Sequence, residues 1–355
     1  MIRCDVVIVG AGPVGLFEVF ELGLLGLRAH LVDAMPQVGG QCIELYPDKP
    51  IYDIPAVPVC SAQELVDRLQ EQIRPFAPEF HLGQTVTQVT RKDDGRFHLQ
   101  TSAGAEFDAA AVVIAGGLGA FAPRTLDLPE ALPLVGHSLH YKITDVSLFE
   151  GRDIVIAGGG DAALDWTLAL LERVRSLVLV HRSGKFRAAP AHVAQMQALC
   201  EAGRMQFLEG DVVGVEAPQG RLQQVRVRAR DGVVRRVAAE HLLVFWGLHP
   251  KLGPIADWGL SREHQQLVVD PATFRTSMPG IHAIGDIAAY PGKKKLILSG
   301  FHECALCAFA LREYLNPGEQ VALQYTTTSP LLQRRLGVRA EADATAEREP
   351  RTRAA

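Results

Sequence analysis

A glycine-rich turn near the start of the chain has the residue spacing of a phosphate-binding loop. Residues Gly10–Gly15 read Gly-Ala-Gly-Pro-Val-Gly and follow the apolar stretch Val6–Val9. In this GxGxxG pattern, Gly10 permits a tight turn, Gly12 lets the backbone approach a pyrophosphate, and Gly15 lets a helix pack closely on a strand. The helix that follows would offer unpaired backbone N–H groups to phosphate oxygens. The pattern therefore predicts a dinucleotide site.

A second turn repeats the first in the same register. It reads Gly-Gly-Gly-Asp-Ala-Ala from Gly158, with alanine in the third position, which the pattern also allows. Asp33 stands as far along the chain from Gly10 as His181 stands from Gly158. The two turns therefore belong to one architectural unit that occurs twice.

The residues at the ends of the two second strands differ in charge. Asp33 would accept hydrogen bonds from a ribose diol and repel a 2′-phosphate, which fits the adenosine of FAD or NAD. Cations follow the other strand, and arginine binds phosphate in a bidentate manner, which fits NADP(H). The alternative for Arg182 and Arg187 is a solvated surface pair. The residues predicted to bind the second nucleotide are Gly158, Gly160, Asp161, His181, Arg182 and Arg187.

The elements that must position these turns alternate between apolar strands and amphipathic helices, which favours an α/β fold. We expect two Rossmann-like dinucleotide-binding domains, each with a β-meander. The strands and helices expected around the first turn are 6–9, 13–26, 29–33, 62–76, 85–101 and 110–115. Those expected around the second are 154–157, 161–173, 176–181, 212–216, 222–228, 233–238 and 242–245. The long Gly/Pro-rich segment 35–58 is of a size that usually serves a ligand.

The order of these elements predicts a discontinuous first domain. We expect residues 1–117 and 248–325 to form the FAD-binding domain, because segment 281–315 has a glycine turn and a helix but no partner unit of its own. Residues 118–247 would form the NADP-binding domain. Residues 326–355 would form a C-terminal extension whose polar end is disordered.

The composition is that of a globular protein and narrows the classes of partner. The 355 residues are 48% hydrophobic and 21% charged, and the net charge of −4 leaves no basic footprint for nucleic acid. No apolar run reaches the roughly 18 residues of a membrane helix, and no secretory signal is evident. The six cysteines are scattered, which favours reduced thiols in the cytoplasm.

The chain resembles the thioredoxin-reductase-like ferredoxin–NADP reductases over nearly its whole length. In particular, Gly285-Asp286 follows Pro279–Ile284, which is a second flavin signal in that family. The resemblance implies an enzyme with FAD and NADP as cofactors. The matching segments are 10–15, 39–41, 46–49, 51–53, 158–166, 181–188, 273–277, 280–287 and 290–299.

The resemblance also implies particular cofactor contacts. The residues that it assigns to FAD are Asp33, Gln41, Tyr46, Val86, Phe121, Asp286 and Thr327. Tyr46 would stack on the flavin, and Tyr325 would cover the opposite face, reaching across a homodimer to the partner's flavin. Taken from the sequence alone, both tyrosines are equally compatible with ordinary surface positions. The chain departs from the family at Ala162, Ser183 and Gly184, and the loss of a cation at Ser183 weakens the expected preference for NADPH.

The cysteines do not follow the thioredoxin reductases, which share the layout of two glycine turns. Those enzymes carry a redox CxxC shortly before the second turn, and residues 134–151 contain no cysteine here. The pair Cys304 and Cys307 falls instead on the helix after Gly285-Asp286. We expect these two to be buried packing residues, with a redox role as the alternative. We expect no metal site, because a second pair of ligands at zinc spacing is missing.

The expected chemistry is hydride transfer between NADPH and FAD, followed by one-electron exchange with ferredoxin or flavodoxin. A helix that opens near residues 299–303 would direct its positive end at the flavin edge where charge accumulates. Lys293-Lys294-Lys295 would help to dock an acidic ferredoxin, with a solvated turn as the alternative. Two other hypotheses remain open: an NADPH-dependent reductase of a flavin, quinone or small disulfide protein, and a dinucleotide sensor without turnover.

Overall fold

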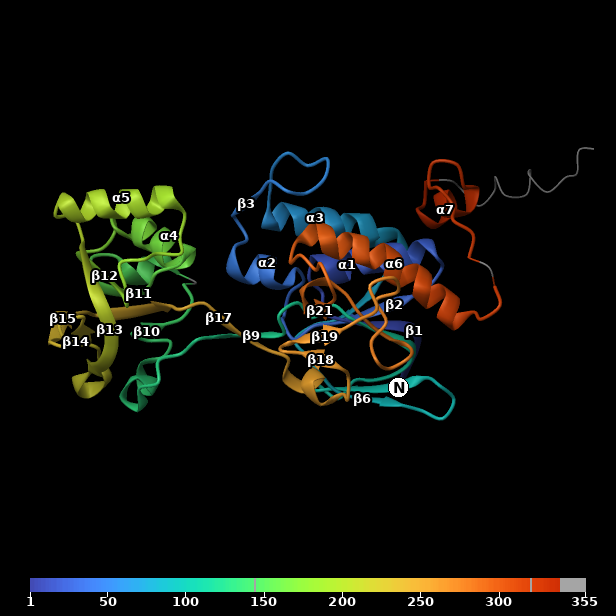
Figure 1. Cartoon of the computed structure of the whole chain (residues 1–355), viewed down its shortest axis with the longest axis horizontal. Coiled ribbons are helices and arrows are strands. Elements are labelled where there is room, and N and C mark those ends of the chain that lie inside the picture. The colour runs from blue at the N-terminus through green and yellow to red at the C-terminus, as the bar shows by residue number, and fades with distance from the viewer. Residues whose placement is uncertain (144, 320, 339–355) are drawn as a thin grey trace, which may run out of the picture. The chain divides into compact units, whose positions relative to one another are not determined.

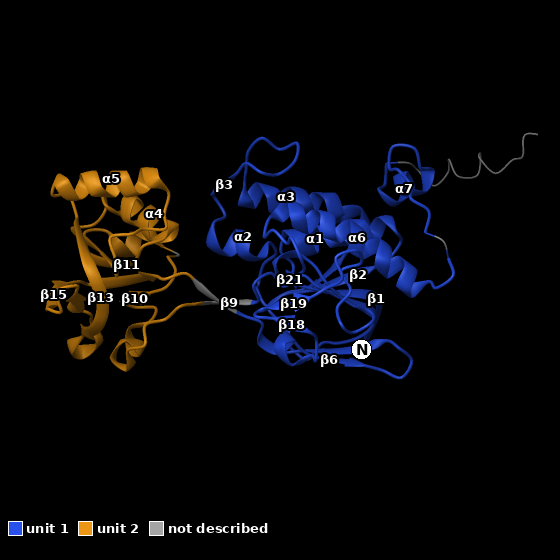
Figure 2. Ribbon diagram, in the orientation of Figure 1, with its two compact units in different colours: residues 1–120, 250–355 blue, residues 121–249 orange. Residues whose placement is uncertain are grey.

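A computed structural model describes residues 1–143, 145–319 and 321–338, and the side chains of residues 120–122 and 248–250 lie outside that description. The chain forms two compact units (Figure 2). Unit 1 comprises residues 1–120 and 250–355, and unit 2 comprises residues 121–249. The chain passes between the units through β9 Ala120–Pro123 and β17 Leu248–Lys251, which pair with each other. The disorder expected beyond residue 340 concerns residues outside the described part.

The main sheet of unit 1 combines parallel strands with an antiparallel meander. In order across the sheet, the strands are β5 Glu79–His81, β2 Ala29–Val32, β1 Ile2–Val9, β8 Glu106–Ile114, β7 Phe97–Thr101 and β6 Val86–Arg91, and β20 Ile281–Ala283 also pairs with β8. Strands β5, β2, β1, β8 and β20 pair in parallel, and β8, β7 and β6 are antiparallel. Strands β2 and β8 and the part of β1 from Val6 to Ile8 are buried almost throughout, because both faces of the sheet are covered there.

The helices of unit 1 place the first glycine turn at the carboxyl edge of β1. They are α1 Pro13–Leu24, α2 Gly40–Leu45, α3 Ala62–Ile73, α6 Ile297–Leu315 and α7 Pro330–Arg335. Helices α3 and α6 both contact α1 (Figure 1). Helix α1 opens with proline at its first position, where the missing N–H costs nothing. Helix α3 opens with a capping box between Ser61 and Glu64, a device that contributes about 1 kcal/mol.

Unit 2 repeats this plan. In order across its sheet, the strands are β10 Leu139–His140, β16 His241–Phe245, β11 Asp153–Gly158, β12 Ser176–His181, β13 Gln206–Glu216, β14 Gln224–Ala229 and β15 Val234–Ala238. The first five pair in parallel and the last three form an antiparallel meander. Helix α4 Asp161–Leu170 follows the second glycine turn, and α5 Pro190–Glu201 precedes β13. The expected fold of two Rossmann-like domains with meanders is confirmed.

Short elements complete the two units. The remaining strands are β3 Pro50–Ile51, β4 Cys60–Ser61, β18 Arg262–Glu263, β19 Gln266–Val268 and β21 Ala288–Ala289. The short 3₁₀ segments are 74–76, 129–134, 146–149, 218–220, 253–257 and 285–287. None of the helices in the described ranges combines the length and the apolar character that a bilayer crossing requires.

Three helices were missed by the sequence analysis: α2, α5 and α7, the last of which lies in the expected C-terminal extension. Helix α5 lies where no element was expected, although Pro190 at its first position and the residues Ala, Gln, Met and Leu that follow are good helix formers. Few of its side chains are buried, so its apolar periodicity is weak. Helix α2 is a short helix within the long Gly/Pro-rich segment, and its cap Gly39 has a φ of 110°.

Candidate nucleotide-binding sites

The glycines of the first turn are required for different reasons. A side chain at Gly10 would approach the carbonyl oxygen of Ala115 to 2.4 Å, and one at Gly15 would approach the carbonyl oxygen of Gly10 to 2.0 Å. Both positions are therefore closed by the protein itself. A Cβ at Gly12 would meet no atom within 4 Å, and its φ of −72° suits any residue. The fold does not demand glycine at position 12, so the requirement there fits a ligand that comes close to the backbone.

The second turn shows the same division of roles. A Cβ at Gly158 would approach the carbonyl oxygen of Phe245 to 2.6 Å and the side chain of Ala163 to 2.7 Å. A Cβ at Gly160 would meet nothing within 4 Å, and the φ there is −102°. In each unit the first glycine thus faces the end of the central returning strand, and the second faces open space. This repeated geometry fits two phosphate-containing ligands, one in each unit.

Asp33 is fixed at the first turn by two backbone hydrogen bonds. Its carboxylate accepts the N–H of Ala11 at 2.6 Å and the N–H of Met35 at 2.8 Å. Burial raises the pKa of Asp33, and these two hydrogen bonds oppose that rise. Each carboxylate oxygen can accept more than one hydrogen bond, so both retain capacity for hydroxyl donors. The structure therefore holds an oriented acceptor beside the glycine turn.

The second turn has a histidine ring and two arginines near it in place of the carboxylate. The His181 ring lies over Gly159, where a Cβ would come within 2.3 Å of Nε2. Burial lowers the pKa of His181, and the positive charges of Arg182 and Arg187 lower it further. Both arginines are exposed, and neither forms an ion pair among the described residues. The N–H of Arg187 donates to the carbonyl of Gly159 at 2.7 Å, which ties this cationic segment to the turn.

Asp161 links the second turn to the segment before α5. It is the first residue of α4, and its Oδ1 accepts the N–H of Ala189 at 2.9 Å. The predicted residues Gly158, Gly160, Asp161, His181, Arg182 and Arg187 are therefore gathered around one helix N-terminus. Phosphate oxygens are favoured at such a position, because backbone N–H groups and the helix dipole both point toward it.

Two further segments converge on the first turn. The N–H of Gly39 donates to the carbonyl of Ala11 at 2.8 Å, and a Cβ at Gly40 would lie 3.1 Å from the Cα of Gly12. This contact places Gln41, the next residue of α2, close to the turn. From the other side, Gly285 lies against Val14, with its φ at +76°. The structure thereby brings the Gly285-Asp286 turn to the start of α1.

Tyr46 and Asp286 belong to the same neighbourhood. The hydroxyl of Tyr46 lies 3.6 Å from Sγ of Cys42, and burial raises the pKa of this tyrosine. The charge of Asp286 raises the pKa of Tyr46 and of Cys42 as well. Asp286 is half-buried; burial raises its pKa, and Lys293 and Lys295 oppose that rise. An aromatic ring and a half-buried carboxylate are thus available where a flavin ring and its ribityl chain are expected.

Two of the other predicted flavin contacts, Tyr325 and Thr327, are exposed. Tyr325 is 65% exposed, and Thr327 is exposed, with its carbonyl accepting a hydrogen bond from Gln333 at 3.2 Å. Val86 is buried at the start of β6, close to Gln84, whose N–H donates to the carbonyl of Asp33 at 3.0 Å. Phe121 lies in β9, and its side chain falls outside the described residues.

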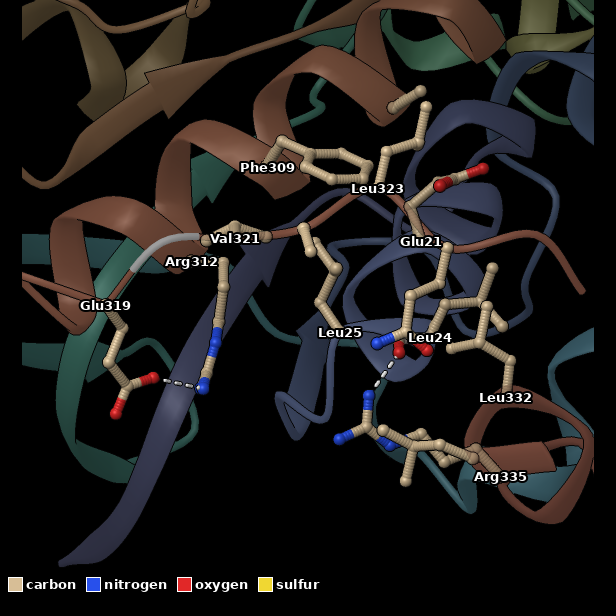
Figure 3. A pocket seen from close by; sticks show the side chains of 14 residues that line it. Glu21, Leu24, Leu25, Phe309, Arg312, Glu319, Val321, Leu323, Leu332 and Arg335 are labelled. Carbon is tan, nitrogen blue, oxygen red and sulfur yellow. Dashed lines mark hydrogen bonds and ion pairs between the residues drawn. The ribbon is translucent and has the colours of Figure 1, made fainter. Parts of the chain in front are cut away.

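Tyr325 directly follows a segment that lines a pocket at the C-terminal end of α1. Figure 3 shows the pocket, whose lining comes from the ends of α1 and α6 and from the segment that leads to α7. Leu323 and Gln324 line it together with Leu24, at the end of α1. Arg335 donates to the carbonyl of Leu24 and so covers that helix end. Because the glycine turn is at the other end of α1, the segment that carries Tyr325 contacts the far end of the helix from Gly12.

Comparison with known proteins identifies the family. The sequence pattern of the pyridine nucleotide-disulphide oxidoreductases matches residues 4–306. A ferredoxin–NADP reductase of Methylibium petroleiphilum is 57% identical over 341 residues, which is 95% of this chain and 93% of that protein. Ferredoxin–NADP reductase 2 of Cupriavidus necator is 57% identical over 94% of this chain and 90% of its own. This chain belongs to the ferredoxin–NADP reductase family.

The solved structures give the fold of this ferredoxin–NADP reductase family member. A thioredoxin reductase of Lactococcus lactis superposes with a TM-score of 0.71 at 22% identity, over 88% of this chain and 99% of its own. A bacillithiol disulfide reductase of Staphylococcus aureus has a TM-score of 0.73 at 15% identity, over 88% of this chain and 98% of its own. The expected thioredoxin-reductase-like architecture is confirmed.

The CxxC of this ferredoxin–NADP reductase family member lies inside the protein. Cys304 and Cys307 are both fully buried on α6, and burial raises the pKa of each thiol well above its usual value. The Cys304 thiol donates to the carbonyl of Val14 at 3.3 Å. Both thiols face the buried carboxyl group of Glu18, whose pKa is raised by burial, yet no group in the described chain meets hydrogen-bond geometry with its oxygens. The surroundings are those of packing residues, because a reactive thiol needs access and a stabilised thiolate.

The three consecutive lysines 293–295 differ in their exposure to solvent. Lys293 is not a docking residue, because its side chain is only 7% exposed and pairs with the buried carboxylate of Glu303. Lys294 and Lys295 are exposed. The sequence analysis missed Glu303 as a partner, and the signal was weak, since one carboxylate on a helix has no distinctive spacing.

Two histidines form a polar link at the sheet edge of unit 1. His30 on β2 and His81 on β5 have ring nitrogens 3.0 Å apart, and Glu79 lies 3.7 Å from His30. Ligand-type atoms of the three residues all lie within 4.8 Å of one another. Burial and the neighbouring His30 ring lower the pKa of His81. We interpret the pair as two rings that share a hydrogen bond between neighbouring parallel strands.

Proposed function

We propose that this chain is an FAD-dependent ferredoxin–NADP(+) reductase. In this proposal NADPH binds to unit 2, FAD binds to unit 1, and ferredoxin or flavodoxin exchanges electrons one at a time with the flavin in the cytoplasm. The observation that carries the proposal is the pair of matched turns whose strand ends differ in charge, Asp33 in one unit and Arg182 with Arg187 in the other. The names of the relatives support the choice of ferredoxin as partner.

The residues of the chain would bind and orient the reactants. When bound, FAD accepts a hydride and releases single electrons, which couples a nicotinamide to a one-electron carrier. Gly12 and Asp33 would hold the pyrophosphate and the adenosine ribose, Asp286 would accept hydrogen bonds from the ribityl chain, and Tyr46 would cover one face of the flavin. Helix α6 begins at Ile297 and would direct its positive end toward the flavin edge that gains charge.

Substitution of the open glycines tests the assignment of ligand to unit. We expect Gly12→Ala to leave the melting temperature of the apoprotein unchanged, because a Cβ meets no protein atom there, and to raise the Kd for FAD at least about tenfold. Gly160→Ala should keep FAD and raise the KM for NADPH by a similar factor. Each variant is the control for the other. Normal binding of both nucleotides by both variants would contradict the assignment.

The electron acceptor is tested in two stages. Anaerobic addition of NADPH to the FAD-loaded protein should bleach the flavin absorbance near 450 nm within the turnover time, as expected of a functional flavoenzyme. A flavin that stays oxidised would favour a sensor without turnover. Steady-state assays with ferredoxin, flavodoxin, a quinone and thioredoxin then compare kcat/KM. A higher value for the quinone or thioredoxin would replace the proposed partner.

The aromatic residues on the flavin faces are also part of the proposal. Tyr46 would remain stacked, and Tyr325 would cover the flavin of the partner in a homodimer, consistent with its exposure in a single chain. One ring must move aside to admit nicotinamide. Tyr325→Ala should change kcat with NADPH, whereas Tyr325→Phe, which keeps the ring, serves as the matched control. Sedimentation of the wild type as a monomer, or unchanged kinetics, would remove this role.

A further inference from the structure

The loop between the Gly285-Asp286 turn and α6 is tied together by one buried carboxylate. Glu303 on α6 has no exposed surface. Its Oε2 accepts the N–H of Gly285 at 2.6 Å, and its Oε1 accepts the hydroxyl of Tyr290 at 2.7 Å. The same Oε1 forms an ion pair with Lys293, whose side chain is 7% exposed. A single side chain therefore holds the turn, the loop and the helix.

The two ends of this network are fixed in different ways. Lys293 lies over the ring of Tyr290, with 5.5 Å between Nζ and the ring centroid. The tyrosine ring packs edge-on against Phe274 at 5.5 Å. The amide nitrogen of Gln266 donates to the carbonyl of Asp286 at 2.9 Å, so the turn is held from two sides. The position of Asp286 relative to the start of α1 is thus set by several contacts that include Glu303.

Stability alone is a poor explanation for a buried ion pair in this place. Removing two charges from water costs much of what their attraction returns, and apolar replacements of similar size are often neutral or stabilising. A buried polar network is instead suited to fixing one geometry. The pair also acts on Asp286 through its charges: Lys293 lowers the pKa of Asp286 against the effect of burial, and Glu303 raises it. An ionised Asp286 is a better acceptor for hydroxyl groups than a protonated one.

We propose that Glu303 and Lys293 are a positioning pair that sets the Gly285-Asp286 turn for the ribityl chain of FAD. The inference rests on the proposed function, in which unit 1 binds FAD. Glu303 supplies the acceptor that orients the N–H of Gly285. Lys293 neutralises that carboxylate, so that the ionised Glu303 can stay buried in this position. The pair acts through Asp286 and is not itself a catalytic group.

Two double variants separate positioning from stability. In Glu303→Gln with Lys293→Met, the Gln carbonyl can accept from Gly285 and its amide can donate to the Tyr290 oxygen, so the network survives without charge. In Glu303→Leu with Lys293→Met, the site is apolar and the acceptor for Gly285 is lost. Both avoid an unpaired buried charge, and both should leave the melting temperature of the apoprotein within a few degrees of the wild type.

The measurement is the Kd for FAD, obtained by titrating apoprotein and following flavin fluorescence. We expect the leucine variant to bind FAD at least about tenfold more weakly than the wild type, since it loses a buried hydrogen bond to a charged acceptor, and the glutamine variant to remain within about threefold. Equal affinity of the leucine variant and the wild type overturns the proposal. An equal loss in both double variants also overturns it, because the glutamine variant keeps the acceptor.

A second comparison serves if the leucine variant does not fold. Glu303→Gln alone places an amide against the Lys293 ammonium, so FAD binding should weaken, and Lys293→Met should then restore it. A Kd that does not recover in the double variant overturns the proposal. Wild-type protein that takes up no FAD refutes the proposed function together with this inference, whereas wild-type binding with unchanged variants refutes the inference alone.

Discussion

Arg182 shows how one residue could set the choice between two dinucleotides. Its guanidinium is exposed beside the second glycine turn and, among the described residues, has no carboxylate partner. Its neighbour Ser183 carries no charge, so fewer cations face the expected 2′-phosphate than two adjacent arginines would supply. The preference for NADPH should therefore depend strongly on Arg182 and Arg187.

We expect Arg182→Ala to raise the KM for NADPH about 10- to 100-fold, because the variant loses a pair of charge-assisted hydrogen bonds to the 2′-phosphate. The KM for NADH, which has no such phosphate, should change by less than about threefold. Steady-state kinetics with both nucleotides measure this. The control is Arg204→Ala, because Arg204 is an exposed arginine of the same unit that pairs with Glu172. Equal effects of Arg182→Ala on the two nucleotides would show that the residue does not read the phosphate.

The two cysteines of α6 give a second prediction at the residue scale. Cys304 and Cys307 are fully buried and their thiol pKa values are raised, so we expect them to resist alkylation in the native protein. Both lie in the tryptic peptide 296–312, which mass spectrometry can follow after labelling with and without denaturant. The partly exposed Cys200 is the internal control. Rapid labelling of peptide 296–312 in native protein would reopen the redox alternative.

At the scale of elements, β20 contains a buried histidine whose protonation is unfavourable in the folded protein. His282 lies in this strand, which pairs with β8, and it is 1% exposed. Burial, with a further effect from Arg275, lowers its pKa from 6.5 to about 4. Its Nδ1 has no hydrogen-bond partner among the described residues. The folded protein therefore favours the neutral form of the His282 ring over the protonated form.

This arrangement predicts acid sensitivity. In the unfolded chain, His282 becomes protonated below about pH 6.5, whereas in the folded chain it becomes protonated only near pH 4. Between these two values the unfolded chain binds more protons than the folded chain, so the free energy of unfolding falls as the pH falls. At about 1.4 kcal/mol per pH unit, the loss attributable to His282 is about 3 kcal/mol. Urea unfolding at pH 7 and pH 4.5 measures it.

Two variants test the source of that acid sensitivity. His282→Gln cannot gain a proton, so its stability should depend less on pH than that of the wild type, even if its stability at pH 7 is lower. His264→Asn changes an exposed histidine of the same unit and should leave the pH dependence unaltered. Parallel pH profiles of the wild type and His282→Gln would assign the acid loss to other groups.

At the scale of the whole molecule, the described residues of each unit form hydrophobic cores of their own. The core of unit 1 draws on residues up to 115 and from 252 onward, whereas the cores of unit 2 draw on residues 126–244. Cooperative unfolding follows from a shared core, and chains with separate cores often unfold in steps. Ligands that bind one unit should therefore stabilise that unit first.

We expect calorimetry to resolve two transitions that respond to different ligands. FAD at about 100 times its Kd should stabilise unit 1 by about 2.7 kcal/mol, and NADP(+) at a similar excess should raise the transition of unit 2. Gly160→Ala, which should weaken binding of the second nucleotide at least about tenfold, should reduce the second effect by about half or more and leave the first unchanged. A single transition that both ligands shift equally would show that the units unfold as one.

The sequence by itself determined the repeated architecture and the family. Glycines that the fold closes sterically, such as Gly10 and Gly158, leave a regular pattern because no other residue fits beside the carbonyl of the returning strand. Apolar runs marked the central parallel strands for a similar reason: burial on both faces leaves little choice of residue, whereas the exposed edge strand β5, which reads Glu-Phe-His, was not predicted. Helix α5 escaped because a helix with few buried side chains has no strong period to detect.

The tertiary structure alone decided which residues of each motif act together. Three adjacent lysines are alike in sequence, yet only the fold turns Lys293 inward to Glu303 and leaves Lys294 and Lys295 exposed. Likewise, the CxxC pair has a redox spacing but a buried location. Local spacing reports backbone geometry, whereas burial, charge pairing and pKa depend on contacts between residues far apart in the chain, and those contacts exist only after the chain has folded.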